Sequence, residues 1–140
     1  MAVKNIMSPH PVTVEMDDKL SVAKEIFDNI GFHHLLVVNQ DKLCGVVSDR
    51  DILRAISPFI GLASEKNRDV ATLNRRIHQV MTRKLVTIDP SASIAHAVTL
   101  FNQHKVSCLP VVSQDGQVVG IVTWRDVLIE LERQIKRKGF

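Results

Sequence analysis

The same unit occurs twice in this chain, and this internal repeat constrains the fold more than any other feature of the sequence. Residues 6–41 align with residues 80–115 at a constant offset of 74, and residues 42–56 align with residues 117–131 after one inserted residue, Gly116. Identical residues occur along the whole alignment: Met7 with Met81, Val12-Thr13 with Val86-Thr87, Ala23 with Ala97, Phe27 with Phe101, Leu35 with Leu109, Val37-Val38 with Val111-Val112, Gly45 with Gly120, and Arg50-Asp51 with Arg125-Asp126. The repeat predicts two copies of one supersecondary unit.

Each copy begins with a short extended piece, at residues 12–14 and 86–88, that leads into a helix. Apolar side chains at helical spacing predict this helix: Leu20, Ala23, Ile26, Phe27 and Ile30 in the first copy, and Ile94, Ala97, Val98, Leu100 and Phe101 in the second. We expect the helix to stop at Gly31 in the first copy and near Lys105 in the second.

Two β-rich runs with a hairpin-type connection follow, and a second amphipathic helix ends each copy. The runs are residues 35–38 and 43–47, and then 109–112 and 118–122. The final helix carries its apolar face on Ile52, Leu53 and Ile56 in the first copy, and on Val127, Leu128, Leu131 and Ile135 in the second. The order β-α-β-β-α therefore predicts an α/β (α+β) fold.

The predicted boundaries place the first repeat at residues 3–56, a linker at 57–76, the second repeat at 77–133 and a basic tail at 134–140. One repeat alone buries little surface, so we expect the two to pack face to face about a pseudo-twofold axis. The linker is predicted to be a loop followed by a short amphipathic helix near Leu73, Ile77 and Val80. Because it is long for a connector, part of it is expected to cover an edge or to contact another subunit.

Composition excludes several classes of protein. Apolar residues make up 45% of the chain, but their longest runs are far shorter than the roughly 20 residues of a membrane span. Cys44 and Cys108 have no metal-type spacing and are expected to be free thiols. No secretion signal is evident at the start, so we expect a cytoplasmic protein. The basic tail fits a helix end better than a nucleic-acid arm, because it lacks aromatic residues and the net charge is only +3.

The segment Gly45–Ile52 and its counterpart Gly120–Val127 have two interpretations. Ser48 and Thr123 precede a helix with an aspartate three residues later, which is typical of a helix cap. Alternatively, the N–H groups and hydroxyl at a helix start bind phosphate while the carboxylate accepts ribose hydroxyl groups. Capping alone leaves the recurring Arg and the recurring Gly unexplained.

The pattern of Gly, two aliphatic residues, Ser or Thr, two variable residues, Asp and an aliphatic residue resembles the CBS (cystathionine β-synthase) repeat when it ends a β-α-β-β-α unit. Two such repeats form a Bateman module, and the chain resembles short bacterial CBS-pair proteins, some of them associated with acetoin utilisation. The resemblance implies clefts between the repeats that bind AMP, ADP, ATP or S-adenosylmethionine. It implies that nucleotide-binding residues are Val12, Thr13, His34, Leu35, Ser48, Arg50 and Asp51, and then Val86, Thr87, Cys108, Leu109, Pro110, Thr123, Arg125 and Asp126.

Two departures from the usual repeat make the Asp126 site the stronger prediction. Ser48 replaces the commoner Thr, and the first repeat has Leu-Leu-Val-Val at residues 35–38 where the second has Leu-Pro-Val-Val. His34 aligns with Cys108 and is expected to meet phosphate or to cap the strand. Trp124 is expected to pack against a subunit or the linker, with base stacking as the alternative.

No metal, catalytic or cofactor motif is present. The six histidines lack metal-ligand spacing, no nucleophile stands beside a base, and no Gly-rich phosphate loop occurs. We therefore expect a non-enzymatic, homodimeric module that senses an adenine nucleotide and acts on an unidentified regulated protein. The alternative is a structural dimerisation or protein-interaction module without a physiological ligand.

Overall fold

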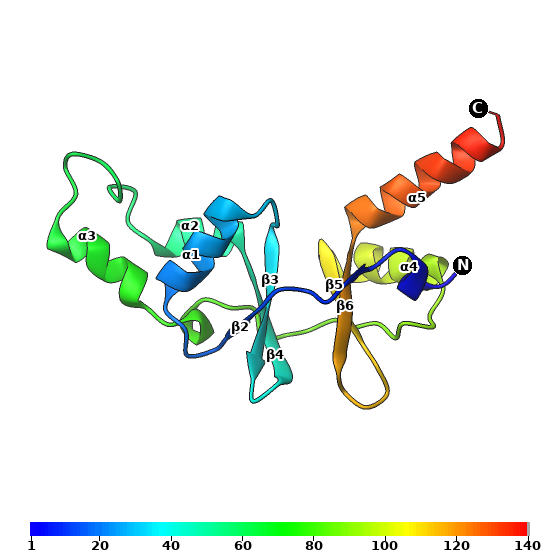
Figure 1. Cartoon of the computed structure of the whole chain (residues 1–140), viewed down its shortest axis with the longest axis horizontal. Coiled ribbons are helices and arrows are strands. Elements are labelled where there is room, and N and C mark those ends of the chain that lie inside the picture. Colours follow the sequence, from blue (N-terminus) through cyan, green and yellow to red (C-terminus); the bar gives the residue numbers. More distant parts are fainter. Residues whose placement is uncertain (140) are drawn as a thin grey trace. The chain divides into compact units, whose positions relative to one another are not determined.

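The computed structural model describes residues 1–139, which form two compact units (Figure 1). The first unit comprises Val12–Leu85, and the second joins Met1–Pro11 to the residues from Val86 onward. Together the described residues contain two three-stranded sheets and five α-helices. The predicted α/β class is therefore confirmed.

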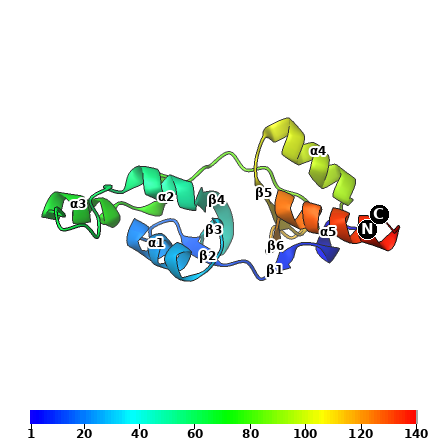
Figure 2. The same cartoon turned by 90° about the horizontal axis from the view of Figure 1, so that it is seen from above.

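The first unit is built on the sheet β2-β3-β4, formed by Thr13–Glu15, His34–Asn39 and Lys42–Ser48. Strand β2 runs parallel to β3, and β3 runs antiparallel to β4. Helices α1 (Leu20–Asn29) and α2 (Asp49–Ala55) pack against this sheet (Figure 2). This part of the chain therefore has the predicted order β-α-β-β-α.

The core of the first unit forms where one face of the sheet meets the two helices. Alternate residues of a strand share a face, so Leu35 and Val37 point to the same side and both are fully buried. The buried cluster consists of Val14, Leu20, Ala23, Leu35, Val37, Val47, Ile52, Ile77 and Met81. The last two members come from the segment that follows the linker.

The second unit has the sheet β1-β6-β5, formed by Ser8–Pro9, Val118–Thr123 and Cys108–Val112. Both strand pairs are antiparallel. Helices α4 (Ile94–His104) and α5 (Trp124–Arg137) belong to this unit. Its core consists of Val3, Ile88, Ala97, Phe101, Leu109, Val111 and Val122. The extended piece predicted at residues 86–88 makes only one parallel bridge, between Ile88 and Val111.

The start of each repeat packs on the unit that contains the rest of the other repeat. A 3-10 turn, η1 (Val3–Asn5), places Val3 in the core of the second unit. The equivalent turn, η3 (Ile77–Gln79), places Ile77 in the core of the first. Backbone hydrogen bonds tie each segment to its unit, from Val3 N–H to Ala92 O (2.8 Å) and from Thr82 N–H to Val46 O (2.9 Å).

This exchange explains the recurring glycine before each capped helix. A Cβ atom built on Gly45 would lie 2.5 Å from Met81 Sδ, and one built on Gly120 would lie 2.5 Å from Met7 Sδ. The strand must lack a side chain here because the exchanged segment crosses it closely. Gly45 and Gly120 are therefore required for packing. Met81 and Met7, which are identical in the two repeats, are the residues that pack against them.

The two hairpin turns differ by one residue, which accounts for the insertion in the alignment. In the first unit the turn is Gln40-Asp41, and both residues have positive φ (52° and 65°), as a two-residue hairpin requires. In the second unit Gly116 has φ +80°, and its N–H donates to Ser113 O at 2.9 Å. The extra residue in the second repeat is thus a turn glycine.

Two predictions about the first helix of each repeat are wrong in detail. Helix α1 ends at Asn29, and Ile30 adopts an extended backbone, so its side chain leaves the helical face and is 39% exposed. In α4, Ala97 and Phe101 are buried but Val98 is 37% exposed, because at about 100° per residue it lies off their face. Lys105 does end α4, in the left-handed conformation.

The linker also differs from its prediction. Its α-helix is α3 (Asn67–Ala71), earlier than expected, and 3-10 turns η2 (Thr72–Asn74) and η3 follow where a helix was predicted. Two hydrogen bonds to the start of α1 explain this, because Leu20 N–H donates to Arg75 O (2.8 Å) and Ile77 N–H donates to Asp18 O (2.9 Å). These bonds hold residues 75 and 77 against the first unit, so the backbone there does not continue as a regular α-helix.

Candidate functional site

In the first unit, the sheet and helix α2 bring most of the predicted nucleotide-binding residues to one place. His34, the first residue of β3, lies opposite Ser48, the last residue of β4. Ser48 Oγ accepts the Asp51 N–H at 3.1 Å, and Asp51 Oδ2 accepts the Ser48 N–H at 2.8 Å. Thr13 begins the neighbouring strand β2, where it is paired with Leu36, and Val12 directly precedes it.

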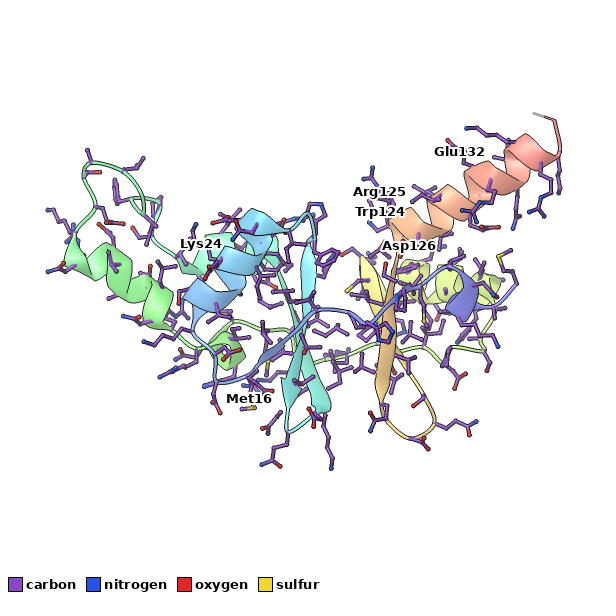
Figure 3. All side chains as sticks on the ribbon, viewed as in Figure 1. Met16, Lys24, Trp124, Arg125, Asp126 and Glu132 are labelled. Atoms are coloured by element: carbon purple, nitrogen blue, oxygen red, sulfur yellow. The ribbon has the colours of Figure 1, made fainter. Side chains whose placement is uncertain are left out.

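The second unit repeats this arrangement with different side chains. Cys108 begins β5 and lies opposite Thr123, the last residue of β6. Asp126 Oδ2 accepts the Thr123 N–H at 2.8 Å and the Thr123 hydroxyl at 3.1 Å, and Thr123 Oγ1 accepts the Asp126 N–H at 3.3 Å. Figure 3 shows Trp124, Arg125 and Asp126 together at the start of α5, where β6 ends.

Both aspartates therefore cap a helix, but the cap uses only one oxygen of each carboxylate. Within residues 1–139, Oδ1 of Asp51 and Oδ1 of Asp126 accept no hydrogen bond. The cap fixes the carboxylate and leaves an acceptor in a defined position. The capping and ligand-binding interpretations are thus compatible in this geometry.

The two arginines next to these aspartates are exposed. The guanidinium groups of Arg50 and Arg125 make no hydrogen bond to any described residue. Each therefore supplies an exposed cation beside a capped carboxylate, which suits a ligand that carries both hydroxyl and phosphate groups.

Histidines make the first site electrostatically different from the second. His33 Nδ1 lies 2.9 Å from Asp49 Oδ2, and the Arg50 N–H donates to Asp49 Oδ1 at 2.8 Å. Burial is the largest single effect on the pKa of Asp49 and raises it, but the hydrogen bonds with His33 and the Arg50 N–H and the charges of the two histidines together outweigh burial, so the net pKa is lowered. Burial lowers the pKa of His34, against the opposing effect of Asp49, and this favours the neutral imidazole.

Several predicted site residues have side chains that a ligand cannot reach without disturbing the core. Leu35 and Leu109 are fully buried members of the two cores, and Pro110 is also fully buried. Their backbone groups are the parts available for recognition. Burial raises the pKa of the Cys108 thiol to about 12, so it is a neutral group in the site.

Of the remaining predicted residues, Thr13 begins β2 and Val12 precedes it, whereas Val86 and Thr87 lie outside the strands, just before the bridge between Ile88 and Val111. Val12 and Val86 are half-buried and pack against their cores, whereas Thr13 and Thr87 are exposed. Asp49 and His33 were not predicted, because the second repeat has residues of other types at the aligned positions. Among residues 1–139, no group of three or more His, Cys, Asp or Glu side chains is placed to hold a metal ion. Each described helix is too short or too polar to cross a bilayer.

Comparison with known proteins gives the family. The sequence model of the CBS domain matches residues 3–58 and 77–133, so it matches the chain twice. A CBS domain-containing protein of Dictyostelium discoideum is 32% identical over 128 residues, which are 90% of this chain and 88% of that protein. Further curated relatives are longer proteins, of which this chain covers 20% to 24%.

Solved structures agree with this result. A putative acetoin utilization protein (AcuB) from Vibrio cholerae is 27% identical, with a TM-score of 0.78 over 99% of this chain and 95% of that one. The CBS domain pair of protein MJ0100, solved with 5-methylthioadenosine and S-adenosyl-L-methionine, is 26% identical, with a TM-score of 0.78 over 96% and 98% of the two chains. CBSX2, solved with AMP, is 28% identical, with a TM-score of 0.76 over 96% and 98%.

The two family matches contain both capping boxes, and together they cover most of the chain. The resemblance inferred from the repeated Gly-to-Asp pattern is therefore confirmed, and the structural neighbours include an AcuB-like pair. The chain belongs to the CBS domain family and carries a pair of CBS repeats.

Proposed function

We propose that this protein is a regulatory module that senses an adenine nucleotide, either AMP, ADP, ATP or a compound like S-adenosylmethionine. The observation that carries the proposal is that each capping box uses only one of the two oxygens of its aspartate carboxylate. Asp51 and Asp126 are held through Oδ2, and Oδ1 stays available to a ligand. Two neighbours, the MJ0100 pair and CBSX2, were solved with ligands that contain a ribose joined to adenine.

Each site would use its residues in three ways. The Asp51 or Asp126 carboxylate accepts ribose hydroxyl groups, which are charge-assisted hydrogen bonds. Ser48 or Thr123, together with the nearby arginine, meets phosphate or ribose. The base is read by backbone groups of the flanking strands: Val12-Thr13 and His34-Leu35 in the first unit, and Val86-Thr87 and Cys108-Leu109-Pro110 in the second.

The proposed output is regulatory and not catalytic. Asp51 and Asp126 are equivalent residues of two repeats, which suits two similar ligand contacts better than one acid and one base. A ligand changes such a protein only if it binds one arrangement of the repeats better than another. A regulated partner protein would read the arrangement that the nucleotide favours.

A ligand panel tests the proposal. AMP, ADP, ATP, S-adenosylmethionine and NADH are added separately to the purified protein, and the melting temperature is recorded against concentration. At 100 times the dissociation constant, a ligand adds about 2.7 kcal/mol to the free energy of unfolding. We expect a saturable rise with at least one adenine nucleotide. No rise with any of them would leave only the second candidate function.

That second candidate is a homodimerisation or interaction module, and helix α5 favours it. Trp124, Leu128, Leu131 and Ile135 recur at helical spacing on α5 and are 42% to 51% exposed. A stripe of this kind is typical of a helix that packs against another chain. We propose that the protein is a homodimer, which is compatible with nucleotide sensing. The free thiols of Cys44 and Cys108 fit a reducing compartment, so we place it in the cytoplasm.

A further inference from the structure

One position beside the capping boxes is acidic in the first unit and aromatic in the second. Asp49 stands between Ser48 and Arg50, and Trp124 occupies the aligned position in the second unit. Figure 3 shows Trp124 next to Asp126 at the start of α5. The two proposed nucleotide sites share an arginine and an aspartate, so this position is where their charges differ.

Asp49 is held in place by hydrogen bonds on both of its carboxylate oxygens. Oδ2 lies 2.9 Å from His33 Nδ1, and Oδ1 accepts the Arg50 N–H at 2.8 Å. The Asp49 N–H also donates to His33 O at 3.0 Å. In contrast, Asp51 uses only Oδ2 in its cap. Asp49 therefore contributes to the site through its charge, which is held at a defined position.

The Asp49 carboxylate is charged at neutral pH. Burial raises its pKa, but the hydrogen bonds with His33 and the Arg50 N–H and the charges of His33 and His34 together lower the net pKa. The side chain is 36% exposed, so solvent and salt weaken its field. The effect on a ligand should therefore be that of a charge near the protein surface.

The field of Asp49 reaches residues that are proposed to contact the nucleotide. Burial is the largest effect on the pKa of His34, and the charges that follow in order of size are those of Asp49, His33, Asp51 and Arg50. In the second unit, burial is the cause of the pKa shift of the aligned residue, Cys108. The first site is therefore the one that experiences the additional carboxylate.

The two sites carry different net charges when their imidazoles are neutral. In the first site, the carboxylates of Asp49 and Asp51 and the guanidinium of Arg50 leave a net charge of −1, whereas Arg125 and Asp126 cancel in the second. Burial favours neutral His34, which then does not offset Asp49. A phosphate group with nearly two negative charges is repelled by the additional carboxylate, and a sulfonium group is attracted.

We propose that Asp49, positioned by His33, makes the first site select adenine nucleosides with an uncharged thioether or a cationic sulfonium at the 5′ carbon, while the second site accepts a phosphate there. This inference rests on the proposed function, because it assigns a ligand class to each of its two sites. Asp49 is the specificity-determining residue, and Trp124 supplies no charge at the equivalent position.

Calorimetry with AMP and methylthioadenosine tests the inference, because both ligands contain adenine and a ribose with two free hydroxyl groups but differ at the 5′ carbon. Titrations at about pH 8 keep ordinary imidazoles neutral. The chain with Asp126→Ala isolates the first site, and the chain with Asp51→Ala isolates the second. We expect the preference for methylthioadenosine over AMP to be about threefold to fivefold greater in the first site, as for a charge pair near a protein surface.

Asp49→Asn removes the charge and keeps an oxygen that accepts the Arg50 N–H. In the Asp126→Ala background, we expect AMP to bind about threefold to fivefold more tightly, and methylthioadenosine affinity to change by less than about twofold. A purely structural role of Asp49 would change both affinities together. Asp41→Asn makes the same substitution in the exposed hairpin turn of the same unit and should change neither affinity.

The second site allows the reverse change. Trp124→Asp and Trp124→Asn both remove the indole ring from the exposed stripe of α5, but only the first adds a charge. In the Asp51→Ala background, we expect AMP to bind Trp124→Asp about threefold more weakly than Trp124→Asn. Methylthioadenosine should bind the two variants equally.

The outcomes separate this inference from the proposed function. If AMP gains no affinity relative to methylthioadenosine in Asp49→Asn, the assignment of ligand classes is wrong while nucleotide sensing stands. No saturable binding of either ligand to the wild type would overturn both. Unchanged binding at two sites in both alanine backgrounds would show that Asp51 and Asp126 do not contact the ligand, and this would also overturn both.

Discussion

The Asp126 carboxylate uses its two oxygens differently, and this division decides how a substitution there should be interpreted. Oδ2 accepts the Thr123 N–H and hydroxyl and so belongs to the cap of α5. Oδ1 accepts nothing among residues 1–139, so only this oxygen is available to a ligand. A test of function must therefore change one oxygen and spare the other.

Asp126→Asn is the substitution that separates the two roles. An amide keeps one oxygen for the cap and turns an NH₂ group toward the ligand, which cannot accept a ribose hydroxyl. We expect nucleotide affinity to fall about tenfold, which corresponds to about 1.4 kcal/mol. The free energy of unfolding should fall by less than about 1 kcal/mol, from the lost charge at the helix start. Calorimetry with the best nucleotide and urea unfolding measure the two effects.

Two further variants complete this experiment. Asp126→Ala removes the cap as well and should cost about 1 kcal/mol of stability in addition to the loss of binding. Asp115→Asn makes the same chemical change in the exposed hairpin turn of the same unit and should bind normally. If Asp126→Asn and Asp126→Ala both bind like the wild type while the second melts earlier, Asp126 is a cap alone.

Gly45 gives a second test at the scale of one residue. A methyl group there would lie 2.5 Å from Met81 Sδ and 3.1 Å from Thr82 O, and only the first of these atoms can move easily. Gly45→Ala should therefore lower the free energy of unfolding by about 1 to 3 kcal/mol, the usual cost of overpacking. At Gly31 a new Cβ meets no atom within 4 Å, so Gly31→Ala should change stability by less than about 0.5 kcal/mol. Equal effects of the two substitutions in urea unfolding would exclude the packing explanation.

At the scale of elements, sequence patterns were accurate where local physics decides the structure. Ser48 and Thr123 start helices because a hydroxyl followed three residues later by a carboxylate satisfies free N–H groups whatever surrounds it. The linker was predicted less well, because tertiary hydrogen bonds to Leu20 and Asp18 decide where its helix ends. No local pattern contains that information.

The loop around Asp69 yields a prediction about pH and local order. The Ser57 hydroxyl, and then the Lys66 N–H, lower the pKa of Asp69 in the folded protein against the opposing effect of burial. A carboxyl with a lowered pKa stabilises the fold above its unfolded pKa of about 3.9, and this contribution is lost as the pH falls through the folded pKa. We expect amide exchange in residues 57–72 to accelerate in that acidic range before it does in the core strands.

Asp69→Asn should reproduce this loosening at neutral pH. The amide has one acceptor oxygen for the two donors that Asp69 now satisfies, so at most one donor keeps its bond to that oxygen, and the negative charge that strengthens both bonds is removed. Trypsin should then cleave after Lys66 or Arg68 several-fold faster, while Asp115→Asn leaves the rate unchanged. Unchanged cleavage in Asp69→Asn would show that Asp69 does not hold the loop.

At the scale of the whole molecule, the repeat predicted the elements but not which unit each segment joins. An alignment of two copies is the same whether Val3 packs on its own repeat or on the other one. The structure places Val3 in the core of the second unit and Ile77 in that of the first. The sequence still held a trace of this exchange, since each recurring glycine is matched by a recurring methionine that packs against it.

The proposed homodimer is a prediction about the whole molecule. At about 100° per residue, Trp124, Leu128, Leu131 and Ile135 fall within one side of α5, and all of them are exposed in the single chain. A second copy would bury this stripe, at about 25 cal/mol for each Å² of apolar surface. We therefore expect sedimentation at micromolar concentration to give a dimer, and Leu128→Ser/Leu131→Ser to give a folded monomer. Ile129 is 51% exposed on a different side of the same helix, so Ile129→Ser should leave the dimer intact. A wild-type monomer, or equal dissociation by Ile129→Ser and the double variant, would contradict pairing through this stripe.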